Sequence, residues 1–423
     1  MKFVSTRSHS NRIGVDEALL SGLAADGGLF VPEKLTKIDT EALSKKNIAT
    51  FAAELLAVFF DESSVRAQLK EICETAFSFE IPMKRLNKHI SVLELTHGPT
   101  CAFKDVGAQF LAATISKLNT ESDLPKTVLV ATSGDTGGAV GCAFSGRNDT
   151  RVVILYPNGR ISDRQERQLT CWQSNVTAYA VEGSFDDCQK MVKEAFSDKA
   201  LRHQLQLLSA NSISLGRLLP QMVYYAYTSA QSKTPVNFII PTGNLGNAIA
   251  AIWAKRLGFK INKIGLALNA NRAIADFLTT REWNPHETIA TLANAMDVGN
   301  ASNIERLRDL FAADENALAD VYATSASDDQ IRQAIKDVYQ DFQYIACPHT
   351  ATAFYAQSQL KWPDAIVVAT ADPAKFNEII EPLINRPIET PPALEAILGK
   401  KFNRNIIGPN YEELRGILLP NNS

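Results

Sequence analysis

From about residue 90 onward, the chain alternates short runs of β-branched and other apolar residues with longer segments of helical pattern. Helical segments between successive strands are typical of parallel sheets covered by helices on both faces. The sequence therefore predicts an α/β fold, in which ligands bind at the carboxyl ends of the strands. The predicted strands are residues 127–132, 151–156, 176–181, 236–240, 263–268 and 365–369.

The same pattern divides the chain into three parts. Residues 1–85 predict a helix-rich N-terminal domain, residues 86–384 the α/β core, and residues 385–423 a proline-interrupted tail that packs on the core. Within the core, residues 265–341 mix a strand with polar helices and an asparagine-rich run without a clear period. We interpret that segment as an insertion or a mobile flank.

Composition narrows the classes of function. The formal net charge of −3 and the absence of basic clusters argue against nucleic acid as a partner. The six cysteines are scattered without a C-x-x-C pair, so we expect reduced thiols and neither a disulfide framework nor a metal site. The N-terminus lacks the apolar core of a signal peptide, and no apolar run approaches the roughly 18 residues of a membrane span. We expect a cytoplasmic protein with no membrane partner.

One lysine, Lys104, lies within LTHGPTCAFKDVGAQF, between a Gly-Pro turn and a predicted helix. The apolar neighbours Cys101, Ala102 and Phe103 disfavour its ammonium form, and a neutral amine condenses with carbonyl compounds. A lone lysine before a helix is more often an ordinary exposed residue. Two further loops favour the functional interpretation.

These loops are ATSGDTGG at 131–138 and PTGNLGN at 241–247, and each follows an apolar run and leads into a helical segment. Glycines let the backbone approach a ligand and direct N–H groups at an anion, to which a helix N-terminus adds positive potential. Neither loop fits the pattern G-x-x-x-x-G-K-S/T or G-x-G-x-x-G. A reactive lysine beside a phosphate cradle suggests pyridoxal phosphate as the cofactor.

The chain resembles the threonine synthase family, in the form found in many bacteria and fungi. The similar blocks are HGPTCAFKDVGAQF, ATSGDTGG, SANSISLGR, PTGNLGN, NAMDVGN and ATADPAKF, and they run in the expected order over most of the chain. The N-terminal STRSHSNRIGVDEALLSGLAADGGLFVP also resembles the opening segment of that family. The resemblance implies the pyridoxal-phosphate-dependent fold type II, with the cofactor in a cleft between two subdomains of the core.

The resemblance also implies the cofactor site. Lys104 is expected to hold the cofactor covalently and to act as the catalytic base, and the glycine-rich loop is expected to bind the cofactor phosphate through backbone N–H groups. Thr370 is expected to hydrogen-bond the pyridine nitrogen. Asp135 stands where many relatives of this fold have asparagine beside the cofactor 3-oxygen, and whether it is protonated or turned away stays open. The expected cofactor-binding residues are Lys104, Asp135, Gly243, Asn244, Leu245, Gly246, Asn247 and Thr370.

Two groups are implied for the substrate. Thr132, Ser133 and Thr136 are expected to bind the α-carboxylate, although alone they would be helix-capping residues. A second phosphate is expected at Asn211, Ser212, Arg217 and Asn244. The alternative for Arg217 is a solvated arginine in the first turn of a helix that continues through Tyr227.

Other polar residues favour ordinary structural interpretations. A histidine on its own is more often a local hydrogen-bonding residue, and this is how we interpret His97 and His349. We expect Arg160, Arg164 and Arg167 on a solvated face.

The expected activity is therefore conversion of O-phospho-L-homoserine and water to L-threonine and phosphate, by γ-elimination and addition of water at the β carbon. Three alternatives stay open. They are a serine or threonine dehydratase of the same fold, a phospholyase acting on an amino-alcohol phosphate, and a protein that binds the cofactor or a partner without catalysis. Monomer and homodimer are both compatible with the sequence.

Overall fold

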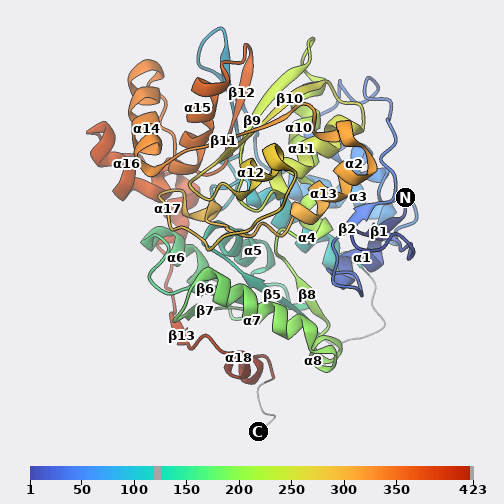
Figure 1. Cartoon of the computed structure of the whole chain (residues 1–423). Helices are drawn as coiled ribbons and strands as arrows, with labels where there is room; N and C mark the ends of the chain where they lie inside the picture. The colour runs from blue at the N-terminus through green and yellow to red at the C-terminus, as the bar shows by residue number, and fades with distance from the viewer. Residues whose placement is uncertain (119–124, 420–423) are drawn as a thin grey trace.

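The structure is a computed structural model, and it describes residues 1–118 and 125–419. Residues 119–124 and 420–423, which fall within the predicted core and tail, lie outside the described residues. The described chain forms an α/β fold with two largely parallel sheets, as the sequence predicts (Figure 1).

The larger sheet has six strands. Its order is β11 (Val321–Ser325), β10 (Ile261–Leu268), β9 (Val236–Pro241), β12 (Ala365–Ala369), β4 (Ile90–Glu94) and β3 (Met83–Arg85). All neighbours are parallel except β3 and β4, which are antiparallel. Strand β12 thus lies between β9 and β4, although it comes more than a hundred residues after β9 in the chain.

The smaller sheet has five parallel strands in the order β13 (Asn405–Ile407), β7 (Val176–Val181), β6 (Thr150–Pro157), β5 (Lys126–Ala131) and β8 (Leu207–Ser209). The edge strand β13 belongs to the predicted tail. The tail therefore packs on the core and also completes one edge of this sheet.

Helices follow the strands and cover the sheets (Figure 1). Those of the core are α4 (Lys104–Lys117), α5 (Asp135–Phe144), α6 (Asp163–Thr170), α7 (Phe185–Ser197), α8 (Lys199–Gln204), α9 (Leu215–Leu218), α10 (Gln221–Ala230), α11 (Gly246–Arg256), α12 (Ala273–Thr280), α13 (Ile304–Ala313), α14 (Asp328–Phe342), α15 (Pro348–Leu360) and α16 (Asn377–Ile384). The 3-10 helices η2 (Asn294–Met296), η3 (Glu315–Leu318) and η4 (Pro373–Phe376) lie between them, and α17 (Pro392–Leu398) and α18 (Tyr411–Leu418) belong to the tail.

Both faces of the central strands, such as β5, β9 and β12, are buried, which explains why these strands read as continuous apolar runs. In the larger sheet, Ile239 and Val367 pack with α14, α15 and α16, whereas Phe238 and Val368 face the cluster that includes α10 and α11. The smaller sheet repeats the arrangement, with α4 and α5 on one face and α7 and α18 on the other. Alternate side chains of one strand thus enter two different cores.

The N-terminal part contains a two-stranded antiparallel sheet, β1 (Phe3–Ser5) and β2 (Phe30–Pro32), and the helices α1 (Val15–Ser21), α2 (Ile48–Ala57), η1 (Arg66–Gln68) and α3 (Leu69–Ala76). Helix α3 packs on α4, and α2 packs on α10. This part therefore supports the helix that begins with Lys104.

Residues 265–341 are neither an insertion nor a flank, so this prediction was wrong. The segment completes β10, supplies the edge strand β11 and packs α14 on α15. Helix α10 also begins only at Gln221, after Pro220, so Arg217 belongs to the separate short helix α9. No helix among the residues described has the length and apolarity needed to cross a bilayer.

Candidate active site

Loops that follow five strands meet at one pocket. Lys104 follows β4, Asp135 follows β5, Ser212 follows β8, Gly243 follows β9 and Thr370 follows β12. The pocket encloses about 820 Å³ of space, open solvent at its mouth included. Every site residue predicted from the sequence lines it, from Lys104 and Thr132 through Arg217 and Asn247 to Thr370. The roles of the individual residues stay predictions.

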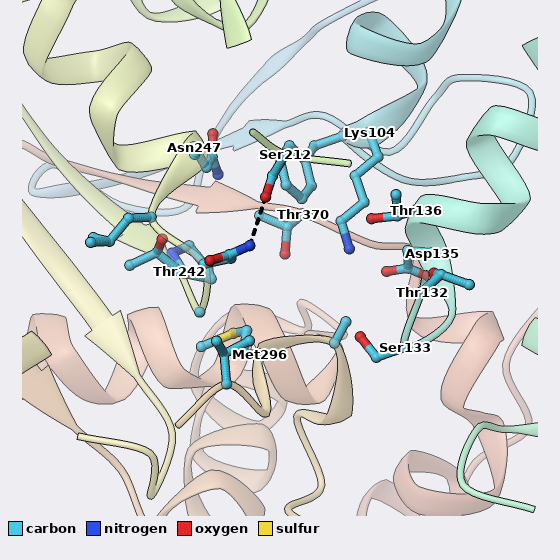
Figure 2. Close-up of a pocket in the computed structure, with 18 of the residues that line it drawn as sticks. Lys104, Thr132, Ser133, Asp135, Thr136, Ser212, Thr242, Asn247, Met296 and Thr370 are labelled. Atoms are coloured by element: carbon cyan, nitrogen blue, oxygen red, sulfur yellow. Dashed lines mark hydrogen bonds between the residues drawn. The ribbon is translucent and has the colours of Figure 1, made fainter. Parts of the chain in front are cut away.

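Lys104 is fixed where two neighbouring strands end. The backbone N–H of Phe103 donates to the carbonyl of Thr370 at 2.9 Å, and Ala102 pairs with Ala371 in an isolated bridge. The amine of Lys104 points into the space between Thr370 and the start of α5 (Figure 2). Burial lowers the pKa of Lys104 to about 8, so a larger fraction of the amine is neutral near physiological pH than in an exposed lysine.

The glycine-rich loop approaches the pocket wall closely at one point. A Cβ on Gly243 would lie 2.7 Å from the Cα of Met296, a separation that packed atoms do not adopt. Leu245 has a left-handed backbone with φ of 63°, and α11 begins at the next residue. The loop therefore places the positive end of α11 against the pocket.

The side chain of Asn247 has an unsatisfied donor. Its Oδ1 accepts hydrogen bonds from the hydroxyls of Tyr224 at 2.6 Å and Tyr225 at 2.7 Å. Its Nδ2 is buried and has no partner among the described residues. A buried amide group without an acceptor is costly, which indicates that a bound group completes this site.

In the loop after β5, the predicted substrate-binding residue Thr132 forms hydrogen bonds within its own loop. The Thr132 hydroxyl accepts from the N–H groups of Gly134 at 3.0 Å and Gly137 at 2.9 Å, so it holds the loop against the first turn of α5. Ser133 and Thr136 line the pocket and are better placed to meet a substrate (Figure 2).

Asp135 forms an ion pair that the sequence analysis missed. Its Oδ1 lies 2.6 Å from the amine of Lys375 and accepts from Nε2 of Gln165 at 3.1 Å. Burial by itself raises the pKa of Asp135, but the charge of Lys375, followed by those of Lys104 and His349, holds it below its ordinary value. The contact with Lys375 favours the ionised form of Asp135 and holds its Oδ1 toward that amine, while its role toward a cofactor stays a prediction.

The predicted receptor for a second phosphate combines two loops. Asn244 Nδ2 donates to the Ser212 hydroxyl at 2.7 Å, shown as the dashed line in Figure 2. The side chain of Asn211 contacts the end of β5, where its Nδ2 donates to the carbonyl of Ala131 at 2.8 Å. Arg217 is only 2% exposed, so the interpretation as a solvated arginine is wrong.

The guanidinium of Arg217 is incompletely satisfied. One nitrogen donates to the carbonyl of Ala210 at 2.8 Å, and Nε is buried without a partner among the described residues. Within the same described part of the chain, Arg217 forms no ion pair. Burial lowers its pKa to about 10, which leaves it charged at neutral pH. A buried cation of this kind is suited to an anionic ligand.

A buried hydrogen-bond network supports the predicted site for the second phosphate on the side away from the pocket. Asn303 Nδ2 donates to the carbonyl of Asn244 at 2.8 Å, and its Oδ1 accepts from Arg306 at 2.6 Å. Arg306 also donates to the carbonyls of Phe30 and Ile213, at 3.0 and 2.7 Å. Through Arg306 the N-terminal strand β2 is connected to the pocket.

Part of the pocket wall comes from η2, where the sequence showed no period. Asp297 holds this segment by accepting from the Thr291 hydroxyl at 2.6 Å and from Asn269 Nδ2 at 2.7 Å. Burial raises the pKa of Asp297 to about 7, although the hydrogen bonds from Thr291 oppose the shift. His349 accepts from the N–H of Ala295 at 3.0 Å through Nε2, and burial lowers its pKa to about 4.

The remaining candidates lie away from the pocket chemistry. His97 is exposed and pairs with Glu94 at 3.0 Å. Arg164 donates to the carbonyl of Ala374, and Arg167 stacks on Phe402 at 4.7 Å. Arg160 and Arg167 are exposed as expected, whereas Arg164 is half-buried, so the expectation of a solvated face holds only in part.

The chemical groups that line the pocket are those that pyridoxal phosphate needs. The pocket combines a buried amine of lowered pKa, a glycine-rich loop at a helix start and a buried amide donor that lacks an acceptor. The Thr370 side chain also reaches the pocket, and a hydroxyl there can hydrogen-bond a ring nitrogen without forcing it to be protonated (Figure 2).

Comparisons with known proteins agree with this chemistry. Residues 79–370 match the family described as "Pyridoxal-phosphate dependent enzyme", and residues 2–77 match the family described as "Threonine synthase N terminus". A threonine synthase of Buchnera aphidicola from Schizaphis graminum is 37% identical, with 99% of this chain and 100% of that protein covered.

Solved structures agree as well. The crystal structure of threonine synthase from Escherichia coli superposes with a TM-score of 0.94 at 33% identity, covering 99% of both chains. The pyridoxal-phosphate-bound threonine synthase from Brucella melitensis has a TM-score of 0.90 at 32% identity, covering 99% of this chain and 98% of that one. The fold class and the family expected from the sequence are thereby confirmed, and the chain belongs to the threonine synthase family of pyridoxal-phosphate-dependent enzymes.

Proposed function

We propose that the chain converts O-phospho-L-homoserine and water to L-threonine and phosphate, as a pyridoxal-phosphate-dependent carbon–oxygen lyase. The observation that carries this proposal is the buried, incompletely paired Arg217 in the same pocket as the amine of Lys104. A cofactor needs one phosphate cradle, which the glycine-rich loop supplies. A second buried cation beside it suits a substrate with its own phosphate.

The chain's residues divide the work by position. Bound pyridoxal phosphate supplies an electron sink that stabilises negative charge at the substrate α carbon. Lys104 removes the proton from the α carbon and then removes a proton from the β carbon, because its amine lies in the pocket and burial lowers its pKa to about 8. Ser133 and Thr136 bind the α-carboxylate, and Thr370 hydrogen-bonds the ring nitrogen.

Arg217, Ser212 and Asn244 hold the phosphate that leaves the γ carbon. Their donors stabilise the charge that develops as the carbon–oxygen bond breaks. One water molecule then adds its oxygen to the β carbon, and protons return to the carbon skeleton, which balances the formation of threonine and phosphate. The buried wall formed by Met296 and Val298 restricts the access of further water.

Two alternative activities differ in what they require. A serine or threonine dehydratase needs Lys104 and the glycine-rich loop, but it has no use for a buried guanidinium at Arg217. A phospholyase would use Arg217 but would release a carbonyl product. The full-length similarity to threonine synthases favours the proposed reaction over both.

Several broader expectations form part of the proposal. The partner is the small-molecule substrate, with no nucleic acid and no membrane, and the chain acts as a monomer or homodimer in the cytoplasm. We also retain the division into residues 1–85, 86–384 and 385–423. The two family matches, which end at residue 77 and begin at residue 79, support a boundary in this part of the chain.

The test is to measure phosphate and threonine formed from O-phospho-L-homoserine by the wild type, Lys104→Ala and Lys401→Ala. Lys401 is an exposed lysine of the tail and serves as the control. We expect equal amounts of both products from the wild type and the Lys401 variant, and neither from the Lys104 variant. Phosphate without threonine would instead identify a phospholyase, and activity with L-threonine alone would identify a dehydratase.

A further inference from the structure

One buried carboxylate, Asp135, lies near two lysines: Lys104, which lines the pocket, and Lys375, which is buried behind it. Lys375 and Asp135 form an ion pair at 2.6 Å, and their side chains are 0% and 3% exposed. The amine of Lys104 forms no hydrogen bond or ion pair with any residue in the described ranges. Asp135 nevertheless faces the same pocket as Lys104 (Figure 2).

The backbone around Lys375 is fixed from several sides. Its carbonyl accepts from the Ser162 hydroxyl at 3.1 Å, and its N–H donates to the carbonyl of Asp372 at 3.2 Å. The Lys375 amine also donates to the carbonyl of Thr100 at 3.1 Å. The amine is therefore held in place at Asp135, because backbone and side chain are both anchored.

The charged and titratable groups found to act on Lys104 come from different elements. Asp135 lies at the start of α5, Arg217 in α9, His349 in α15 and Lys375 in η4. Asp135 is the one anion in this set. In a buried pocket an unneutralised carboxylate attracts the nearest available cation, so without Lys375 the natural partner of Asp135 is the Lys104 ammonium.

We propose that Lys375 is a positioning residue that occupies the Asp135 carboxylate and so leaves the Lys104 amine unpaired and reactive. This inference rests on the proposed role of Lys104 as the residue that joins the cofactor. Lys375 acts through Asp135, and Gln165 completes the arrangement by donating to the same carboxylate oxygen at 3.1 Å.

The direction of the effect follows from the charges. Burial lowers the pKa of Lys104 to about 8, Asp135 opposes this, and Arg217 and Lys375 lower it further. Removing the charge of Lys375 removes one lowering influence and also frees Asp135 to pair with Lys104. Both changes raise the pKa of Lys104 and reduce the fraction of neutral amine.

The experiment measures the reactivity of Lys104 directly. Full-length protein without cofactor is labelled with acetic anhydride over a range of pH, and the label on the Lys104 peptide is quantified by mass spectrometry. The rate at which added pyridoxal phosphate attaches is followed in parallel by absorbance. The variants are Lys375→Met, Lys375→Arg and the double variant Lys375→Met with Asp135→Asn.

For Lys375→Met we expect the labelling midpoint to rise by roughly one pH unit and cofactor attachment at neutral pH to slow by about 10-fold. Lys375→Arg keeps the charge and should stay close to the wild type. The double variant removes both charges, so its midpoint should return to or below that of the wild type. A purely structural role for Lys375 would lower stability without moving any midpoint.

The inference is overturned if Lys375→Met is folded and its labelling midpoint equals that of the wild type, or if the double variant keeps the raised midpoint. Should Lys375→Met fail to fold, Lys375→Gln keeps a hydrogen bond to Asp135 while removing the charge, and the same upward shift is required of it. If pyridoxal phosphate fails to attach at Lys104 in the wild type itself, the proposed function fails instead, which keeps the two outcomes separate.

Discussion

The contact between the glycine-rich loop and the pocket wall predicts opposite effects for two similar substitutions. In Gly243→Ala, the new Cβ would lie 2.7 Å from the Cα and 2.8 Å from the carbonyl oxygen of Met296. These are backbone atoms, so no side chain can rotate away to relieve the contact. In Gly246→Ala, the nearest atom is the Ser212 Cβ at 3.5 Å, an ordinary contact.

The magnitude follows from the distances. Relief requires the loop and η2 to separate by about 0.7 Å, and overpacking of this kind costs roughly 1–3 kcal/mol. Gly246 is the first residue of α11, where alanine is favoured over glycine by up to about 1 kcal/mol. We therefore expect the free energy of unfolding to fall by roughly 1–3 kcal/mol for Gly243→Ala and to stay equal or rise slightly for Gly246→Ala.

The assay is urea unfolding of both variants without cofactor, followed by fluorescence titration of Gly243→Ala with pyridoxal phosphate. If half or more of the separation is transmitted to the pocket, cofactor affinity should fall by roughly 5- to 150-fold, the equivalent of 1–3 kcal/mol. Equal destabilisation of the two variants would refute the reasoning, because it would show that loop flexibility, not the contact with Met296, determines the cost. Unchanged stability of Gly243→Ala would refute it as well.

Two further predictions concern the supports of the pocket. Asn303→Ala removes the donor to the Asn244 carbonyl and leaves Arg306 buried with one acceptor fewer. We therefore expect the free energy of unfolding to fall by roughly 1–3 kcal/mol, and KM for O-phospho-L-homoserine to rise more than kcat falls. An unchanged KM in steady-state kinetics would contradict the role of this network. Asp297 has a folded-state pKa of about 7 and a lower value when unfolded, so the folded state binds the extra proton between roughly pH 4 and 7 and wild-type stability should fall as pH rises through this window. Asp297→Asn should remove that decline, and parallel stability curves for the two proteins would argue against a raised pKa.

Long apolar strands were predictable from the sequence because both of their faces are buried. The predicted strands 176–181 and 365–369 have the observed bounds, and the other four differ by one or two residues at their ends. Strands β4 and β8 were not predicted. Strand β4 is only partly buried and carries the polar residues Ser91 and Glu94, so it does not read as an apolar run, and β8 consists of only three residues.

In the candidate active site, too, some features were predictable from the sequence and others were not. Loops that follow strands could be placed at one pocket because parallel strands bring their carboxyl ends to a common edge. The part played by Lys375 could not be predicted, since it depends on Asp135, 240 positions earlier in the chain. A lysine in the apolar block ATADPAKF was the one available signal. The wall at η2 was misinterpreted because its order comes from the side chain of Asp297, and a sequence without a period gives no sign of such a network.

The place of β12 between β9 and β4 determines when the pocket can assemble during synthesis. Residues 90–94 leave the ribosome early, but the strand that joins them to β9 is residues 365–369. Pairing across such a separation is slow, and it cannot begin until most of the chain has been translated. A nascent chain that ends before residue 365 contains Lys104 but lacks the strand that lies beside it, so the pocket cannot be complete until late in synthesis.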